Sequence, residues 1–363
     1  MRKLLNTLYV TTQGAYLAKE GETLHVRADR ETKLRLPVHN LEGVVCFGNV
    51  LCSPFLLGHC AEKGVAISFL TENGRFLARV TGRTAGNVLL RREQYRRADS
   101  APETAGIAAA IVTAKLANCR AVLQRGTRDR PEDEGNAALT AAADSLRGSI
   151  RRLKPLLDSP NQPKPNEASH EPAPRKAPVD SVRGIEGDGA RTYFGAFDAL
   201  ITSPHEAFRF NGRNRRPPTD PVNALLSFLY TLLLHDIQGA LESVGLDPAV
   251  GFLHRDRPGR PGLALDLMEE LRPVVADRLA LSLINRGQLK PSGFRTEPAG
   301  GVWLKDDDRK TVLKAYQERK RDEIRHPFLD EKIAFGLVPH AQALLFARYM
   351  RGDLDAYPPF VWK

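Results

Sequence analysis

The chain has 363 residues, of which 53 are lysine or arginine and 43 are aspartate or glutamate, so its formal net charge is +10. A chain of this length can form two domains with a sizeable core, and its positive charge favours a polyanionic partner such as nucleic acid. The N-terminus lacks the long apolar segment of a signal peptide, and the most apolar run, 224–234, is well short of the about 20 residues of a membrane span, so we expect a cytoplasmic protein.

Residues 1–85 have the pattern of short strands. Segments rich in β-branched and aromatic residues, several of them alternating in polarity, are separated by Gly, Asn and Asp. We expect strands at 4–10, 23–28, 33–37, 65–70 and 76–80, and one helix at 53–63. These elements predict a small N-terminal β-sandwich or barrel that carries one helix.

A helical pattern begins near Arg91 and continues to the end of the chain. The Ala-, Ile- and Leu-rich segments 104–125 and 136–157 predict long helices. Between 159 and 178, six prolines among polar residues cannot form a packed core, so we expect a disordered loop. This loop could separate two domains, but an insertion within one domain is favoured because the same helical pattern resumes after it. The fold class is therefore α+β, with a β-sandwich-like domain at 1–85 and a larger all-α domain at 86–363.

Three glycines surround Glu186 in the sequence Gly184-Ile-Glu186-Gly187-Asp-Gly189. Each glycine destabilises a helix by up to about 1 kcal/mol relative to alanine. The cluster indicates either a close backbone approach to a metal or a DNA strand, or a helix with loose ends. These residues alone do not decide between the two.

The segment after Thr219 begins a helix that is apolar nearly all round. Asp220 is a favourable N-cap, and Pro221 suits the first helical turn. We expect a buried central helix that extends to about Val244. Its His235 and Asp236 are interpreted as the polar end of a core helix and not as catalytic residues.

Two carboxylates and one histidine in the sequence 254–270 are candidates for a metal site. His254 lies in a cationic loop, and Asp266 and Glu269 follow on a short predicted helix. Residues three apart share a helix face, so both carboxylates would project away from the apolar stripe. Carboxylate oxygens suit Mg²⁺ or Mn²⁺, and manganese also accepts imidazole. A solvated acidic face is the alternative for an isolated helix, and the metal site becomes the better hypothesis only together with Glu186.

Two arginine-rich loops flank these residues. Guanidinium groups bind phosphate well, and those next to the proposed ligands could also neutralise charge on a phosphate in the transition state. The alternative is a pair of solubilising loops. The candidates for nucleic-acid binding are Arg213, Arg215, Arg216, Arg255, Arg257 and Arg260.

Other chemistries lack their motifs. The chain has no P-loop, no GxSxG nucleophile elbow and no GxGxxG dinucleotide motif. Its four cysteines form no CxxC pair, which indicates reduced thiols and no zinc site. Without a nucleotide site, phosphodiester chemistry here would be hydrolysis or isoenergetic exchange.

These motifs together resemble the CRISPR-associated Cas1 family of spacer acquisition over essentially the whole chain. The matching segments are Gly-Ile-Glu186-Gly, the loop from Asn211 to Asn223 before the buried helix, Gly251-Phe-Leu-His254, and Leu-Ala-Leu-Asp266-Leu-Met-Glu269. The ending, Tyr357-Pro-Pro-Phe-Val-Trp362-Lys363, resembles the subtype I-C branch.

The resemblance implies a metal-dependent DNA endonuclease and integrase. Its metal ligands would be Glu186, His254 and Glu269, with Asp266 as a fourth catalytic residue and Mg²⁺ or Mn²⁺ as the cofactor. The 3′-hydroxyl of a captured DNA fragment would attack a phosphodiester at the edge of a CRISPR repeat. A homodimer formed through the β-rich domain, the small partner Cas2 and a Cas4-type nuclease are the protein partners that it implies.

Two alternatives remain open at this point. The protein could be a metal-dependent nuclease that hydrolyses branched or single-stranded DNA, with water in place of the 3′-hydroxyl. It could also be a non-catalytic DNA-binding scaffold whose acidic cluster is structural. The sequence does not distinguish the attacking group.

Overall fold

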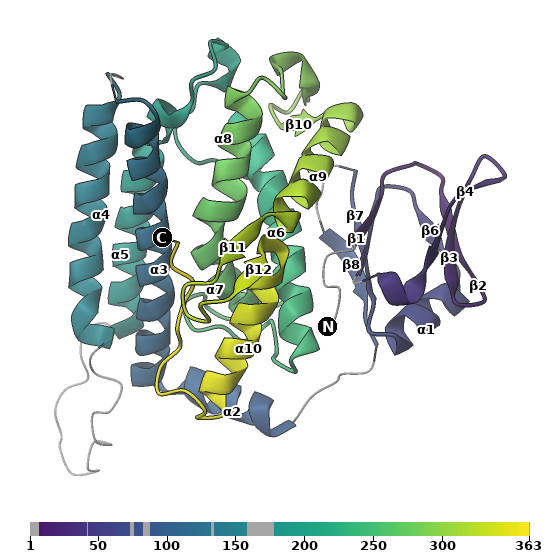
Figure 1. Ribbon diagram of the computed structural model, residues 1–363, viewed down its shortest axis with the longest axis horizontal. Helices are drawn as coiled ribbons and strands as arrows, with labels where there is room; N and C mark the ends of the chain where they lie inside the picture. Colours follow the sequence, from purple (N-terminus) through teal and green to yellow (C-terminus); the bar gives the residue numbers. More distant parts are fainter. Residues whose placement is uncertain are drawn as a thin grey trace.

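The computed structural model describes residues 7–41, 43–72, 76–82, 88–131, 134–157 and 178–362. Its two parts follow each other along the chain: β1–β8 with α1, and then a mostly helical part (Figure 1). The α+β class predicted from the sequence is confirmed. Most of the predicted proline-rich loop, 159–177, lies outside the described residues.

The N-terminal part consists of two four-stranded sheets that face each other. The first has the order β1-β5-β7-β8 and the second β4-β3-β2-β6. Side chains of both sheets meet in one core, among them Leu17, Leu24, Val44 and Ile67. The strands are β1 (Thr7–Val10), β2 (Tyr16–Glu20), β3 (Thr23–Ala28), β4 (Glu31–Pro37), β5 (Gly43–Phe47), β6 (Leu51–Cys52), β7 (Ala66–Leu70) and β8 (Phe76–Val80). The sandwich-like prediction therefore holds.

Helix α1 (Pro54–Glu62) lies between β6 and β7 and confirms the helix predicted there. The Ser53 hydroxyl accepts a hydrogen bond from the Leu56 amide at 3.2 Å, and Pro54 occupies the first turn. This is the expected chemistry of a helix start.

The C-terminal part is built on long helices. Helices α3, α4 and α5 stand side by side, and α6 lies between this group and the sheets (Figure 1). The helices are α2 (Val88–Asp99), α3 (Ala101–Asp129), α4 (Asn136–Leu157), α5 (Pro178–Gly195), α6 (Pro221–Ser243), α7 (Gly262–Leu271), α8 (Arg278–Asn285), α9 (Asp306–Arg321) and α10 (Val338–Met350). A π-helical turn, η4 (Arg272–Asp277), joins α7 to α8.

The expectation of an all-α second part is wrong in one detail. Two small antiparallel ribbons interrupt the helices. They are β9 (Phe294–Thr296) with β10 (Val302–Leu304), and β11 (Glu323–Arg325) with β12 (Lys332–Ala334). Strands of three residues are too short to produce a recognisable alternation in the sequence.

Helices α3 and α6 are long and apolar enough to cross a membrane by composition alone. However, 67% and 61% of their most apolar windows are buried inside the protein. The apolar helix is therefore longer than the run 224–234 suggested, and it is a core helix. As predicted, Asp220 caps α6 by accepting a hydrogen bond from the Asn223 amide at 2.8 Å.

His235 and Asp236 on α6 connect the two parts of the chain. His235 Nδ1 lies 3.1 Å from Ser68 Oγ on β7, and Asp236 accepts a hydrogen bond from the Tyr316 hydroxyl at 2.8 Å. Asp236 also lies 3.0 Å from Lys320 Nζ. Both residues have the structural role that the sequence predicted.

Because His235 is buried in this contact, we predict that the free energy of unfolding depends on pH. Burial, together with the nearby Arg79, lowers the pKa of His235 from 6.5 to about 4. Because the pKa is lower in the folded state, the neutral His235 side chain contributes fully to folding stability above pH 6.5. This contribution is lost as the pH falls towards about 4. Between about pH 7.5 and about pH 5, we expect the free energy of unfolding to fall by up to about 2 kcal/mol through this group.

Urea unfolding of the wild type and of His235→Gln at both pH values measures this contribution, with the exposed His39→Gln as control. Burial raises the pKa of Glu270 to about 8 and acts in the opposite sense, so the quantity of interest is the difference between variants at each pH. An equal pH dependence in the wild type and His235→Gln would contradict the prediction.

Candidate metal centre

A short loop places His254 beside the N-terminal half of α7. The loop passes very close to the helix, because a β-carbon at Gly251 would lie 2.6 Å from the Gly262 carbonyl carbon and 2.8 Å from Asp266 Oδ2. Glycine is therefore required at this position for steric reasons. The approach brings the amides of Phe252, Leu253 and His254 onto the Asp266 carboxylate.

Asp266 is fully buried and positions His254. Its Oδ2 accepts hydrogen bonds from the amides of Phe252 at 2.6 Å and Leu253 at 3.0 Å. Its Oδ1 accepts one from the His254 amide at 2.9 Å and lies 2.7 Å from His254 Nδ1. A carboxylate bonded to Nδ1–H leaves Nε2 of the ring as the free ligand atom.

This arrangement corrects one sequence-based expectation. Asp266 and Glu269 were expected to project away from the core, yet both are buried, with exposed fractions of 0% and 2%. The catalytic role predicted for Asp266 stays a prediction, and the contacts of its carboxylate show that it positions His254. Nearly every residue of α7 is buried, so the helix has no solvated face that the sequence pattern could reveal.

Glu186 and Glu269 both contact Lys115, a residue that was not predicted from the sequence to belong to the site. Lys115 on α3 forms an ion pair with Glu186 on α5, and its Nζ lies 2.7 Å from Glu269 Oε2. Arg272 Nη1 donates a hydrogen bond of 2.6 Å to Glu269 Oε1, and His254 Nε2 lies 3.9 Å from the same oxygen. The three predicted ligands thus belong to one cluster, with the Lys115 ammonium between the two carboxylates.

Neighbouring charges keep both Glu269 and Lys115 ionised despite their burial. Burial alone would raise the pKa of Glu269, but Arg272 and Lys115 lower it to about 2. Burial alone would lower the pKa of Lys115, but Glu269 and Glu186 raise it above its ordinary value. The carboxylate is therefore ionised, as a metal ligand must be.

The donor set fits a divalent cation. Glu269 Oε2 is a buried carboxylate oxygen without a hydrogen bond in the described parts of the chain, and its close charge is the Lys115 ammonium. His254 contributes a free Nε2 that faces the same carboxylate. Within those parts, no three ligand-type side chains already converge at coordination distance. In the arrangement described here the Lys115 ammonium occupies the place next to Glu269 Oε2, so a cation could be held there only if the lysine moved aside.

A cavity of about 740 Å³ opens next to this cluster. Its lining includes Lys115, Glu186 and Arg272 of the cluster, together with Arg191 and Arg215. Arg213 also lines it, but its guanidinium is held by Asn223 Oδ1 at 2.6 Å and by Ser227 Oγ at 3.0 Å. Arg213 is thus partly a structural residue, while Arg215 is exposed and free to contact a ligand.

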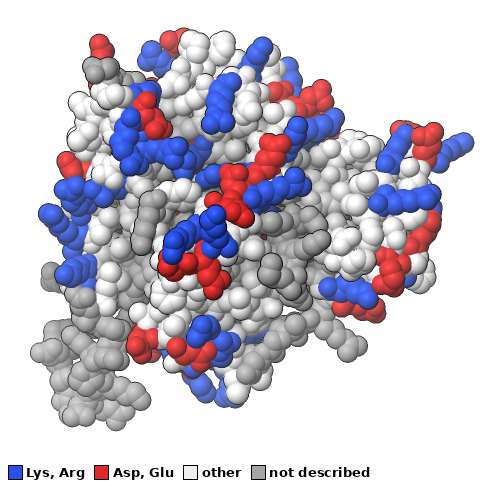
Figure 2. All heavy atoms as spheres, viewed as in Figure 1, with Lys and Arg blue, Asp and Glu red and all other residues white. Residues whose placement is uncertain are grey.

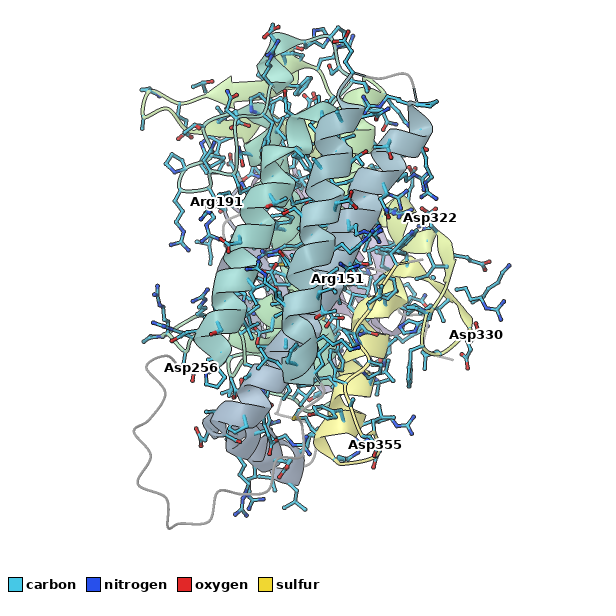
Figure 3. The ribbon with its side chains drawn as sticks, turned by 90° about the vertical axis from the view of Figure 1, so that its left-hand side faces the viewer. Arg151, Arg191, Asp256, Asp322, Asp330 and Asp355 are labelled. Carbon is cyan, nitrogen blue, oxygen red and sulfur yellow. The ribbon has the colours of Figure 1, made fainter. Side chains whose placement is uncertain are left out.

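The two arginine-rich loops predicted to bind nucleic acid lie near each other. Burial lowers the pKa of Arg260, and the positive charges of Arg257, Arg215 and Arg216 lower it further. Arg255, in the same loop as Arg257, donates a hydrogen bond of 3.0 Å to Asp180. In Figure 3, Arg191 and Asp256 both lie to the left of α5.

Of the three glycines around Glu186, only Gly189 lies at a close approach between backbone and a neighbouring side chain. A β-carbon at Gly189 would overlap the side chain of Leu116 on α3, whereas Gly184 and Gly187 face open space. The close neighbour is another helix and not a ligand. Helix α5 is continuous through all three glycines.

Replacing Asp266 with asparagine is expected to weaken metal binding without removing a ligand. The amide nitrogen would face backbone N–H donors, so the loop and the His254 ring would shift. Loss of such a supporting carboxylate typically reduces metal affinity about 10- to 100-fold. Isothermal titration with Mn²⁺ measures this loss, and Glu270→Gln is the matched control because Glu270 bonds to Tyr357 and Phe360. Unchanged Mn²⁺ affinity in Asp266→Asn would show that Asp266 does not support the site.

Comparison with known proteins identifies relatives along the whole chain. The family model "CRISPR associated protein Cas1" matches residues 8–318. CRISPR-associated endonucleases Cas1 from Chlorobaculum tepidum and Rhodospirillum rubrum are 54% and 55% identical over 363 residues, which is 100% of each chain. A Cas4 exonuclease/Cas1 endonuclease fusion from Geobacter sulfurreducens is 34% identical over 362 residues, covering 98% of this chain and 60% of the fusion.

Solved structures share the fold at low identity. A Cas1 protein from Thermotoga maritima superimposes with a TM-score of 0.78 at 22% identity, covering 99% of this chain and 100% of that one. A casposase bound to an integration product gives 0.80 at 20% identity, covering 99% and 94%. The Cas6-RT-Cas1–Cas2 complex gives 0.77 at 22% identity, covering 99% of this chain and 36% of that one.

Proposed function

Because this chain belongs to the CRISPR-associated Cas1 family and is an endonuclease of CRISPR spacer acquisition, we propose that it works as a divalent-metal-dependent integrase. It would insert a captured DNA fragment into a CRISPR array by attack of the fragment's 3′-hydroxyl on a phosphodiester. The observation that carries the proposal is the cluster of Glu186, Glu269 and His254 Nε2 beside a cavity lined with arginines. The scaffold alternative is not retained, since the relatives that match the full length are endonucleases.

The metal would be Mg²⁺ or Mn²⁺, bound by Glu186, Glu269 and His254 Nε2. When bound, such a cation lowers the pKa of a hydroxyl and neutralises charge on phosphate and leaving oxygens. His254 would be a ligand through Nε2 and not a general base, because its Nδ1 faces the Asp266 carboxylate at 2.7 Å. The two carboxylates suit both metals, and the imidazole favours Mn²⁺.

The protein's own residues bind and orient the DNA. Arg191 and Arg215 line the cavity and would hold phosphates of the strand whose end enters it. Arg272 is fixed by Glu269 and lies over the Tyr230 ring at 4.8 Å, so its positive charge would face a phosphate bound in the cavity. The exchange breaks one P–O bond and forms another, so neither ATP nor a covalent enzyme intermediate is required.

The partners follow from the family. We propose that the protein binds DNA and works with Cas2 and with a Cas4-type nuclease; relatives exist as a Cas4/Cas1 fusion and in a Cas1–Cas2 complex. Exposed apolar side chains of the sandwich, such as Phe55 (83% exposed) and Leu77 (53% exposed), support a homodimer formed there. Light scattering would show about twice the mass of the 40.1 kDa chain if this is correct.

Two finer assignments belong to the same proposal. The segment Tyr357-Pro-Pro-Phe-Val-Trp362 supports subtype I-C, and action on a CRISPR array in cellular DNA supports a cytoplasmic location. Acquisition activity with Cas2 and Cas4 proteins of a I-C system, and not with those of another subtype, would test the first. Fractionation of cells that express the protein would test the second.

The function is tested by strand transfer. A short duplex with a labelled end is incubated with a CRISPR-repeat plasmid, the Cas2 partner, and Mg²⁺, Mn²⁺ or EDTA. We expect labelled DNA joined to the repeat edge with either metal and none with EDTA. Cleaved plasmid without joined label would favour the nuclease alternative. Joining in EDTA would contradict the metal requirement.

A further inference from the structure

A second cavity, of about 590 Å³, lies where α3, the start of α8 and the C-terminal segment meet. In Figure 1 the chain ends beside α3 in this region, and Figure 2 shows basic side chains gathered on the upper left of the same face. Four arginines surround the cavity: Arg120, Arg125, Arg128 and Arg278. Apolar side chains, among them Ala121 and Val274, form part of its lining.

Three of the four arginines of this cavity have no ion pair in the described parts of the chain. Arg125 Nε lies 3.3 Å from Asp129, but Arg120, Arg128 and Arg278 form no ion pair with any residue that the structure describes. Arg120 Nε is buried without a hydrogen-bond partner there. Burial and the positive charges of Arg125 and Arg319 lower the pKa of Arg278, and they outweigh the opposite effect of Asp129. The site thus concentrates positive charge that an anionic ligand would neutralise.

This cavity is separate from the metal centre. Lys115 and Cys119 of α3 line the catalytic cavity, whereas Arg120 and Ala121 line the second one. The same division holds after α7, where Arg272 and Asp277 belong to the first cavity and Val274 and Arg278 to the second. The two cavities therefore lie on different sides of the same helices, and DNA in the catalytic cavity does not fill the second.

We infer that the second cavity docks an acidic peptide segment of a partner protein, with an apolar side chain between carboxylates. The carboxylates pair with the arginines, and the apolar side chain covers the apolar lining. A nucleic-acid strand matches the charge but has no group for that lining other than its bases. The ring available for stacking, Trp362, already has the guanidinium of Arg278 over it at 5.1 Å and that of Arg319 at 5.7 Å.

The test uses two charge-matched double variants of the full chain. Arg125→Glu with Arg128→Glu changes the cavity, and Arg147→Glu with Arg151→Glu changes exposed residues of α4, where Figure 3 shows Arg151. Fluorescence polarisation measures binding of a fluorescein-labelled peptide, Asp-Glu-Leu-Asp-Glu, and of a labelled single-stranded oligonucleotide. Strand cleavage by each variant confirms that the catalytic centre is intact.

The cavity variant is expected to lose at least about tenfold in peptide affinity and the α4 variant less than about twofold. Oligonucleotide affinity is expected to fall equally in both variants, because their net charges match. Equal peptide affinity in the two variants would overturn the proposal. A selective loss of oligonucleotide binding in the cavity variant would assign the cavity to nucleic acid and also overturn it.

Discussion

Replacing His254 with alanine is expected to reduce strand transfer by about three orders of magnitude, the effect of losing about 4 kcal/mol of transition-state stabilisation. The change removes Nε2, the one nitrogen in the proposed ligand set, and leaves the Asp266 carboxylate with its amide donors. The fold around it should therefore persist, since Asp266 still accepts hydrogen bonds from the amides of Phe252 and Leu253. Single-turnover strand transfer at saturating Mn²⁺ measures the loss.

His205→Ala is the matched control, because His205 is exposed and lies in a loop of the same helical part. It should retain wild-type rates. Circular dichroism and thermal unfolding of both variants separate a lost ligand from a lost fold. If His254→Ala joined DNA at the wild-type rate with an unchanged metal requirement, the histidine would have no place in the site.

Replacing Lys115 with methionine is expected to destabilise the metal-free protein by about 3–5 kcal/mol, because two carboxylates lose the buried cation that they share. Glu269 is almost fully buried and lies 2.7 Å from the lysine nitrogen. Mn²⁺ would take over that role, so it should stabilise the variant much more than it stabilises the wild type. Its affinity should also rise, since binding no longer requires the ammonium to move.

Thermal and urea unfolding in EDTA and in Mn²⁺ test this prediction, together with a Mn²⁺ titration. Lys154→Met, which replaces an exposed lysine of α4, is the control and should behave as the wild type in all three experiments. Equal stability of Lys115→Met and wild type in EDTA would show that the lysine does not serve as the internal counter-ion of Glu186 and Glu269.

Much of the fold could be predicted from local patterns. Strand β3 and helix α4 have the predicted bounds, because alternation and an Ala/Leu-rich period are strong signals. Strand β5 was missed: its five residues, 43–47, are all buried, so its sequence has no alternation. Val45 and Phe47 pack with the helical part, while Val44 and Cys46 pack inside the sandwich. Such burial on both faces depends on the tertiary arrangement and leaves no periodic signal.

The site was predictable only in part. Glu186, His254 and Glu269 were candidates from their side-chain chemistry, the family resemblance implied them as ligands, and the structure brings them into one cluster. Lys115 was missed because it lies in an apolar helix, where one lysine in the run Ala-Lys115-Leu-Ala looks incidental. A buried lysine requires a carboxylate partner, so its position within that run was the available signal. The positioning role of Asp266 could not be seen, because it depends on three backbone amides of a folded loop.

The most direct test of the metal centre is anomalous diffraction from a crystal soaked in Mn²⁺. We predict one manganese peak bounded by the carboxylates of Glu186 and Glu269 and by His254 Nε2, with Lys115 moved away from Glu269. A peak bound by other residues, or an empty cluster in which Lys115 still bridges the two glutamates at a Mn²⁺ concentration that supports strand transfer, would contradict the account.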